Sequence, residues 1–375
     1  MKSNKTLCWL ATSVLSFSVL GERAIAATSG DPVEVVSGGI QSVDAPAARS
    51  AALELLDRAR SGSRLQARGQ GYDLKVSFTV NSGGQTNYDG AWQMEDIFDP
   101  QQGLRWTART GNAYTITEIS SKGKLYSEGT EGPIPLRLQE ARAALLDAIP
   151  SAARMALLDL PSAAEFTRAP VRTAMATFQG TSVTCVLYSL AQTTATAEPG
   201  RRWQELEDCV DPQSGLLIVH SQVPGRYFAY DYSNAPQLAG QMFPHRVTVI
   251  EAGRTVSQIS VDSLTELRSA DESLFVPTPE MLEGGRATTM SGARKMARVV
   301  GEGKPAGTPI CIFGVVTAAG KLVEAHSLQP DDPNSAAAVK AAGEMNFLRP
   351  TPGVIGAPPQ QQFAFVFIRF ASQSR

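Results

Sequence analysis

Three histidines are the side chains best suited to metal binding or acid–base catalysis in this sequence of 375 residues. His220 ends an apolar run, His245 starts an expected strand, and His326 lies in a further expected strand. None has a second ligand at the spacing of a zinc site, and the H-E-x-x-H motif is absent. We therefore interpret all three as strand histidines with hydrogen-bonded partners, and we predict no metal site.

Two short motifs suggest phosphate binding or serine chemistry, and both fail on inspection. Residues 314–321 (GVVTAAGK) approach a phosphate loop, but the glycines are one residue too far apart and Leu322 replaces the required Ser or Thr. Residues 121–124 (SKGK) match S-x-x-K, but they lie in a polar turn without the accompanying motifs. A hydrolase assembled from dispersed residues is the remaining enzymatic alternative. We predict a protein that is not an enzyme, with no catalytic residue and no cofactor.

The composition excludes several classes of protein. The chain is 19% charged, with a formal net charge of −2 and no basic run, which argues against binding to nucleic acid. A mean hydropathy of −0.11 and one short apolar run exclude a protein with many membrane spans. The length suits two ordinary domains.

The first residues resemble an export signal. Lys2 and Lys5 precede an uncharged, mostly apolar stretch at 6–20, and Ala24-Ile25-Ala26 fits a small-x-small cleavage site. We predict a signal peptide over 1–26, a mature chain beginning near Ala27 with no transmembrane span, and a periplasmic or secreted location. An uncleaved N-terminal anchor is the alternative.

Export makes a structural disulfide possible, because disulfides persist in oxidising compartments. Cys185 and Cys209 lie in two expected strands, 181–190 and 203–210, which a short connector can bring together. We predict a disulfide between them, worth roughly 3 kcal/mol in the chain-entropy model. A redox-active pair is the alternative, although the C-x-x-C motif is absent. We interpret Cys311 as a small buried apolar residue.

Alternating apolar residues predict a chain made mostly of strands. In 72–80 the residues Leu74, Val76, Phe78 and Val80 share one side. Apolar residues at helical spacing predict helices over 47–59 and 135–160, the second broken at Pro150. The remaining expected strands of the larger part are 88–98, 104–110, 114–120, 124–128, 174–179, 181–190, 203–210, 215–222, 226–232, 245–252 and 254–264.

One turn sequence occurs twice. Residues 99–104 (DPQQGL) and 211–216 (DPQSGL) share Asp-Pro-Gln-x-Gly-Leu between expected strands. Proline presets the first central residue of a turn, and glycine supplies the positive φ that leads back into a strand. We therefore predict hairpins over 97–107 and 209–220.

The segments 243–247 (FPHRV), 259–264 and 271–277 (DESLFVP), together with the leading helix and the helical insert, resemble the LolA/LolB-type lipoprotein carriers. The resemblance covers 47–280. It implies a curved antiparallel half-barrel around helices and an apolar cavity, in which an acyl chain would gain about 0.8 kcal/mol per buried methylene. The alternative is that the same residues fill the cavity.

The last part resembles the C-terminal domain of TonB-type energy transducers. It carries FGVV at 313–316, GKLVEA at 320–325, an Ala-rich helix over 336–345, and a closing aromatic strand over 363–370. The sequence departs from the family at 345–347, where MNF replaces Trp-Arg-Phe, and it lacks a motor-contacting membrane helix. The resemblance implies a small ββαβ domain.

We therefore predict an α+β fold with five parts: a signal peptide (1–26), a flexible arm (27–46), a LolA-like β-rich domain (47–280), a linker (281–304) and a TonB-C-like domain (305–372). Residues 291–300 of the linker could form a helix.

The closing strand is the surface best suited to a partner. Phe363, Phe365 and Phe367 share one side of it, with apolar residues on the other. If this strand lies at a sheet edge, it can add a strand of another protein. We therefore treat these three residues as a candidate partner-binding strand.

These observations lead to one main hypothesis. The chain is an exported, non-enzymatic protein that binds a lipid or the acyl chain of a lipoprotein, docks envelope proteins through its C-terminal domain, or does both. The alternatives are an envelope scaffold with a solid half-barrel and an accessory to energy-transducer transport.

Overall fold

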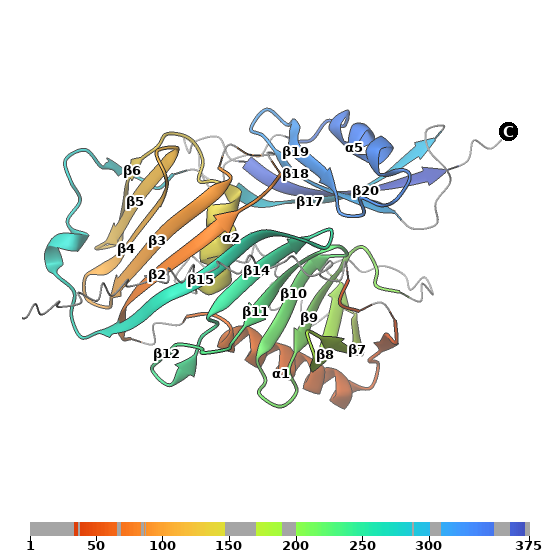
Figure 1. Cartoon of the computed structure of the whole chain (residues 1–375), viewed down its shortest axis with the longest axis horizontal. Coiled ribbons are helices and arrows are strands. Elements are labelled where there is room, and N and C mark those ends of the chain that lie inside the picture. The colour runs from red at the N-terminus through yellow and green to blue at the C-terminus, as the bar shows by residue number, and fades with distance from the viewer. Residues whose placement is uncertain are drawn as a thin grey trace, which may run out of the picture. The chain divides into compact units, whose positions relative to one another are not determined.

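A computed structural model gives the fold (Figure 1). The structure describes residues 34–36, 38–65, 69–83, 86, 88–146, 170–189, 200–286, 289–300, 309–348 and 361–371. The predicted signal peptide, the expected cleavage before Ala27, and residues 147–160 of the second predicted helix lie outside these ranges. Among the described helices, none is both long enough and apolar enough to cross a membrane.

Fourteen of the described strands form one antiparallel sheet, in the order β1-β7-β8-β9-β10-β11-β14-β15-β2-β3-β4-β5-β6-β16. The long strand β15 pairs with β14 on one side and with β2 on the other, so it joins two meanders into one sheet. The strands are β1 (Gln41–Ser42), β2 (Gly71–Val80), β3 (Gly90–Asp99), β4 (Gly103–Thr110), β5 (Tyr114–Ser121), β6 (Lys124–Gly129), β7 (Val171–Phe178), β8 (Thr181–Ser189), β9 (Glu205–Val210), β10 (Leu217–Val223), β11 (Arg226–Asp231), β14 (Arg246–Glu251), β15 (Arg254–Leu267) and β16 (Leu282–Glu283).

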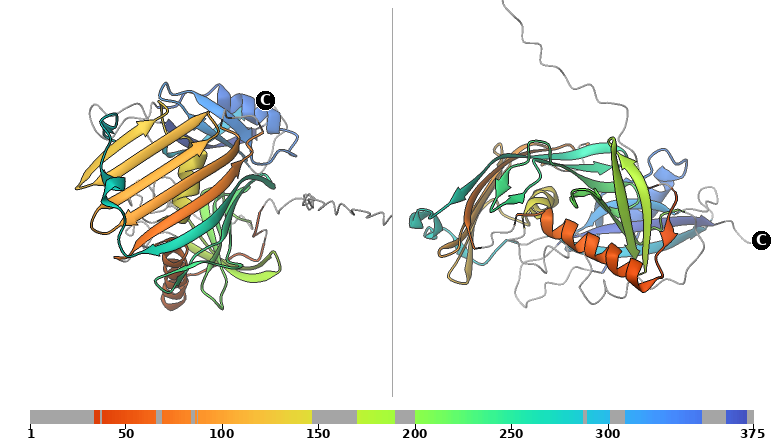
Figure 2. Two further views of the ribbon diagram at one scale, coloured as in Figure 1. Left: turned by 60° about the vertical axis from the view of Figure 1, so that its left-hand side comes forward. Right: turned by 90° about the horizontal axis from the view of Figure 1, so that it is seen from below.

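The sheet is curved, as we predicted, and its concave side carries α1 (Pro46–Gly62) and α2 (Leu136–Leu145) (Figure 2). In β2 the predicted alternation holds, because Leu74, Val76, Phe78 and Val80 are buried and Lys75 is exposed. Burial of one face against the helices explains this period of two.

Both copies of the repeated turn form hairpins, as predicted. In the first, the Asp99 carboxylate accepts hydrogen bonds from the backbone N–H groups of Gln101 and Gln102. Gly103 follows with a φ of 123°, and a Cβ there would lie 2.0 Å from the Ser120 carbonyl oxygen. β3 then pairs with β4, and at the second copy β9 pairs with β10.

A second sheet has the order β17-β20-β18-β19. Its elements are β17 (Thr289–Val300), β18 (Ile310–Val316), β19 (Leu322–Ser327), α5 (Ser335–Gly343) and β20 (Gln361–Ala371). The order β18-β19-α5-β20 along the chain is the ββαβ sequence that we expected. β17 is an addition to it: the stretch that we assigned to a linker with a possible helix contains a strand, which pairs in parallel with β20. The remaining short elements are β12 (Gln237–Leu238), β13 (Gln241–Met242) and the 3-10 helix η1 (Glu272–Phe275).

The closing strand β20 lies inside the small sheet, so the condition on which strand addition depended, a position at the sheet edge, is not met. β17 pairs along one side of it and β18 along the other, so both rows of its backbone groups are used. Phe363, Phe365 and Phe367 are each 1% exposed. They therefore offer no free strand edge to a partner.

The two sheets share one hydrophobic core. Phe363, Phe365 and Phe367 of β20, together with Phe313, belong to the same buried cluster as Tyr72 and Trp92 of the large sheet. The rings of Trp203 and Phe367 lie 4.6 Å apart. The opposite face of the small sheet packs against Ala338 and Ala342 of α5.

Candidate functional site

An aromatic wall lines the concave face of the large sheet on β2 to β5. Phe78 stacks on Trp92 at 5.4 Å, and Trp92 lies 5.7 Å from Tyr114. Trp106 and Tyr72 complete the wall, and all five side chains are at most 3% exposed. We call these five residues, Tyr72, Phe78, Trp92, Trp106 and Tyr114, the aromatic wall.

The helix α2 lies over the concave face and is buried on nearly every side, with only Gln139 half-buried. Its arginines therefore need partners inside the protein. Arg142 donates to the Asp96 carboxylate at 2.9 and 3.1 Å and lies over the Trp106 ring at 4.3 Å. Asp96 also accepts a hydrogen bond from Tyr72 at 3.0 Å. Burial raises the pKa of Asp96, and Arg142 opposes this effect.

The other end of α2 is tied to the opposite half of the sheet. Arg137 donates to both oxygens of Glu251 on β14, at 2.8 and 3.0 Å. Glu251 also accepts from Arg226 on β11 at 2.7 Å, and Arg226 donates in turn to Glu140 of α2. Burial by itself would raise the pKa of Glu251, but Arg137 and Arg226 outweigh it and hold the pKa well below its usual range.

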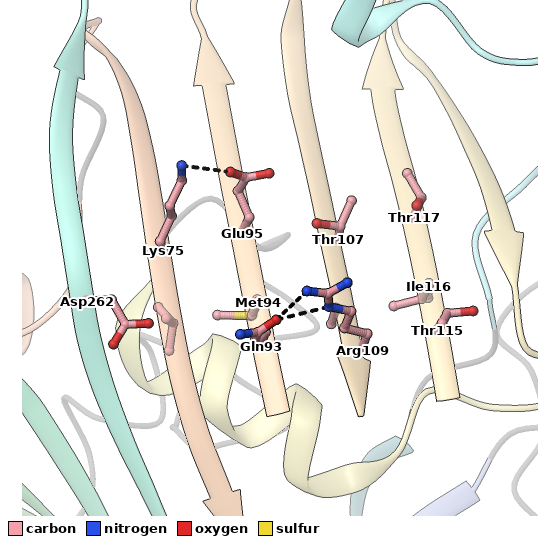
Figure 3. A pocket seen from close by; sticks show the side chains of 12 residues that line it. Lys75, Gln93, Met94, Glu95, Thr107, Arg109, Thr115, Ile116, Thr117 and Asp262 are labelled. Atoms are coloured by element: carbon pink, nitrogen blue, oxygen red, sulfur yellow. Dashed lines mark hydrogen bonds and ion pairs between the residues drawn. The ribbon is translucent and has the colours of Figure 1, made fainter. Parts of the chain in front are cut away.

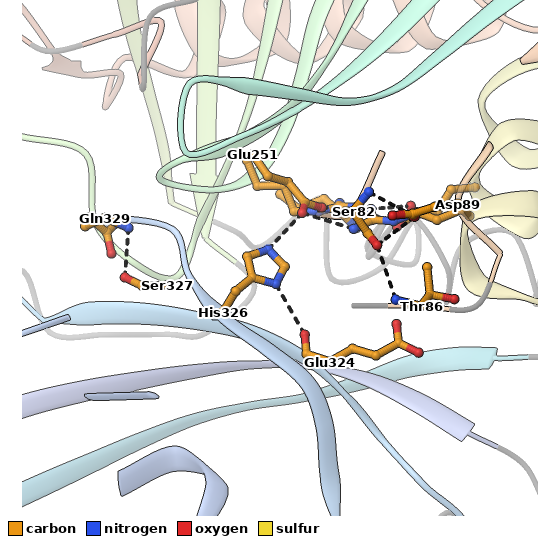
Figure 4. Close-up of polar contacts among 12 residues, drawn as sticks. Ser82, Thr86, Asp89, Glu251, Glu324, His326, Ser327 and Gln329 are labelled. Atoms are coloured by element: carbon orange, nitrogen blue, oxygen red, sulfur yellow. Dashed lines mark hydrogen bonds and ion pairs between the residues drawn. The ribbon is translucent and has the colours of Figure 1, made fainter. Parts of the chain in front are cut away.

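The small sheet joins the same network (Figure 4). His326 on β19 lies with Nε2 2.9 Å from the Glu251 carboxylate and with Nδ1 3.2 Å from the Glu324 carbonyl oxygen. The guanidinium groups of Arg137 and Arg226 lie over the Phe313 ring at 5.5 and 4.7 Å. We call Arg137, Glu140, Arg226, Glu251 and His326 the junction network, because they join α2, the large sheet and the small sheet.

A second buried network lies between α1 and the strands β8 to β10. The Asp208 carboxylate pairs with Arg60 at 3.0 Å and with His220 Nδ1 at 2.7 Å, and it accepts from Tyr188 at 3.0 Å. Burial by itself would raise the pKa of Asp208, but Arg60 and His220 outweigh this effect and hold the pKa below its usual range. Asp208 and His220 are 0% and 1% exposed, so this network is enclosed between α1 and the strands.

The structure places the three predicted strand histidines differently. His220 and His326 have the hydrogen-bonded partners that we expected. His245 differs, because its Nδ1 is buried without a partner in the described part of the chain. The three histidines lie in separate surroundings, and the structure brings no two of them together.

The predicted disulfide between Cys185 and Cys209 is present, at directly opposed positions of β8 and β9. Both cysteines are 0% exposed. Glu207 Oε1 lies 3.2 Å from the Cys209 sulfur, but the bonded sulfurs are not available as metal ligands. Burial, opposed by Arg201, raises the pKa of Glu207 to about 7. Cys311 is buried, as predicted, and forms no disulfide within the described residues.

The convex face of β2 to β5 carries a polar hollow of about 540 Å³ (Figure 3). Several of its polar side chains bond to one another. Lys75 lies 3.4 Å from Glu95, and Arg109 donates to the Gln93 side chain at 2.6 and 3.0 Å. These groups are partly exposed and satisfy one another, so we interpret this hollow as a solvated sheet face.

Comparisons with known proteins give low similarity. No protein-family model and no curated protein matches the chain. Among solved structures, a LolA-superfamily protein from Nitrosomonas europaea is 10% identical, with a TM-score of 0.33, and the match covers 60% of this chain and 97% of that one. A putative outer membrane lipoprotein-sorting protein domain from Vibrio parahaemolyticus is 8% identical, with a TM-score of 0.34 and the same coverages. The MucA/MucB complex of Pseudomonas aeruginosa is 10% identical, with a TM-score of 0.26, and the match covers 69% of each chain. Superpositions with such scores do not establish a common fold.

Proposed function

We propose that this chain is an exported, periplasmic, non-enzymatic carrier that binds the acyl chain of a lipid or lipoprotein against its aromatic wall. One observation carries the proposal: a short helix with buried charged side chains, α2, covers a concave apolar surface. In this proposal α2 moves away from the wall and the acyl chain takes its place.

Displacement of α2 would break its buried ion pairs with Asp96 and Glu251. A buried ion pair contributes little net free energy compared with apolar packing, but it defines one arrangement. Arg137, Glu140 and Arg142 would regain hydration on leaving the sheet, which offsets part of the free energy lost when their ion pairs break. An acyl chain that replaces α2 would gain about 0.8 kcal/mol for each methylene that it buries.

The lack of enzymatic activity is also a proposal. The groups that could act as acid and base, Asp208 and His220, are buried and bound to each other and to Arg60. In this proposal the small sheet braces α2 through the junction network, and β20 takes no part in docking.

Binding is tested by displacement of a fluorescent fatty acid from the purified chain. We expect displacement by long-chain fatty acids at micromolar concentration. Binding no tighter than to an unrelated β-protein would overturn the proposal and would leave a structural scaffold as the better interpretation.

The role of α2 is tested by a reversible lock. Leu65 and Leu146 form an isolated bridge at the end of α2, and the Leu65 N–H donates to the Leu145 carbonyl oxygen at 2.8 Å. We expect the oxidised double variant L65C/L146C to lose fatty-acid binding and to regain it with a reductant. Each single variant, treated in the same way, is the matched control and should bind throughout. Unchanged binding by the locked variant would show that α2 does not move.

A further inference from the structure

Arg64 is a buried cation for which the described part of the chain provides no anionic partner. It follows the C-terminus of α1 and is 3% exposed. Its backbone is held in place, because the Gln241 side chain donates to its carbonyl oxygen at 2.7 Å. Its Nε is buried with no hydrogen-bond partner, and no carboxylate in the described ranges forms an ion pair with its guanidinium group. Arginine does not lose its proton in proteins, so this charge persists at neutral pH.

Two further unsatisfied donors belong to the same region. Tyr230 lies in β11, and Tyr232 directly follows the end of that strand. The hydroxyl groups of both are buried and have no partner among the residues that the structure describes. Burial raises the pKa of Tyr230 to about 12 and that of Tyr232 above its usual range, and Arg64 opposes both shifts, which places the three groups within electrostatic reach of one another. Both hydroxyls are therefore protonated donors at neutral pH.

The charges around Arg64 do not balance. Arg64 interacts electrostatically with Arg60 and Asp208, which already pair with each other at 3.0 Å. Among the residues that the structure describes, two guanidinium groups thus face one carboxylate, which leaves one positive charge in excess. An uncompensated buried charge is strongly unfavourable, so native proteins pair such a group or use it to bind a ligand.

The region is continuous with apolar surface. Leu65, the residue after Arg64, and Tyr230 belong to the same buried cluster as the aromatic wall. A cation with two hydroxyl donors at the end of an apolar surface matches a molecule with an anionic head and an apolar chain.

We propose that Arg64, Tyr230 and Tyr232 bind the anionic head group, carboxylate or phosphate, of an amphiphile. The guanidinium group and the two hydroxyls donate hydrogen bonds to its oxygens, and the apolar chain continues toward the aromatic wall. This assignment rests on the proposed carrier function and makes it more specific: the ligand is an anionic lipid.

Head-group recognition is tested with oleate and its neutral counterpart oleyl alcohol, which share the same chain. We expect the wild-type chain to bind oleate at least tenfold more tightly than oleyl alcohol. Arg64→Met should bring the two affinities within about twofold by weakening oleate alone. The double variant Y230F/Y232F keeps both rings and should reduce the preference for oleate over oleyl alcohol several-fold. Arg58→Gln makes the same charge change at an exposed position of α1 and should leave both affinities unchanged.

The outcomes separate this inference from the proposed function. Equal binding of oleate and oleyl alcohol by the wild-type chain overturns the head-group site but not the carrier. Binding of neither overturns the carrier function. Acetate and inorganic phosphate carry the anionic head group without the apolar chain. If either raised the melting temperature of the wild-type chain as much as oleate does, the site would bind a free anion and the proposed amphiphile would be overturned.

A ligand-free measurement tests the unpaired charge itself. Because Arg64→Met removes an uncompensated buried cation, we expect its melting temperature without ligand to exceed that of the wild-type chain, while Arg58→Gln changes little. A lower melting temperature for Arg64→Met would show that an unseen counter-charge satisfies Arg64 and would overturn the inference.

Discussion

His326 of the small sheet and Glu251 of the large sheet lie 2.9 Å apart, at the point where α2 meets both. Glu251 is 1% exposed and also accepts from Arg137 and Arg226. A single carboxylate thus joins elements from three distant parts of the sequence, and its removal should affect all of them.

Glu251→Gln should strongly destabilise the fold, because among the described residues it leaves Glu140 as the one carboxylate paired with Arg137 and Arg226. Breaking a buried ion pair costs about 3–5 kcal/mol of unfolding free energy. Urea denaturation measures this loss. The matched control is Glu283→Gln, whose partner Lys124 is exposed and 3.1 Å away, and which should change the midpoint little. A loss for Glu251→Gln no larger than that control would show that the network is not structurally important.

Stability should fall in acid through Asp208 and Glu251. The pKa of each is lower in the folded protein than in the unfolded chain. Each therefore contributes stability that is fully present above its unfolded pKa of about 4 and is lost as the pH falls through its folded value. The midpoint of urea denaturation should decline between pH 7 and pH 3 for the wild type. For Asp208→Asn the decline, measured from that variant's own midpoint at pH 7, should be less steep. Parallel declines would contradict the prediction.

Glu207 should act in the opposite direction. Its folded pKa of about 7 lies above the unfolded value, so the folded state binds more protons between about pH 4.5 and 7. Its contribution to stability is present at the acid end of this window and is lost as the pH rises. Glu207→Gln should remove this slope in urea titrations across the window. An unchanged slope would show that the carboxylate is ionised throughout and paired with Arg201, which lies 3.0 Å away.

Loss of the disulfide should cost about 3 kcal/mol, because the bond closes a loop with a sequence separation of 24. The double variant C185A/C209A removes it without leaving a free thiol. Guanidinium denaturation should show the loss, and dithiothreitol should no longer change the midpoint. Cys311→Ala is the control, and it should keep the response of the wild type to the reductant.

Gly225→Ala should weaken the contact between the two sheets. Gly225 has a φ of 85°, and an added Cβ would lie 2.8 Å from the Leu328 carbonyl oxygen. Gly240 has a similar φ of 74° with nothing within 4 Å, so Gly240→Ala costs the same backbone strain without the clash. Thermal melts should show a greater loss for Gly225→Ala by about 1–3 kcal/mol. Equal losses of stability in the two variants would show that the turn at Gly225 can move away from Leu328.

Local sequence signals predicted much of the large sheet. The alternation in β2, the two Asp-Pro-Gln-x-Gly-Leu hairpins and the paired cysteines all depend on residues near one another in the chain or on one chemical bond. These features are present in the structure. The resemblance to the TonB C-terminal domain stays a prediction from sequence.

Long-range pairing was not predictable from local patterns. Residues 291–300 are rich in Ala, Arg, Lys and Met, which favour helices, yet β20 provides a partner and the segment forms β17. The same pairing places β20 in the interior of its sheet. In α2 the Leu/Ala pattern predicted a helix on an apolar surface, but the partners of Arg137 and Arg142 come from β14 and β3. Nothing near Arg64 in the sequence distinguishes it from a surface arginine.

The pairing of β15 with β2 also decides when the fold can form. Strand β2 lies near the start of the described chain, and its partner β15 is synthesised much later, after β14. Non-local pairing of this kind makes folding slow. Slow closure of the sheet suits the export that we propose, because the chain can cross a membrane before the sheet forms. A chain truncated before Arg254 would leave the edge of β2 open to aggregation.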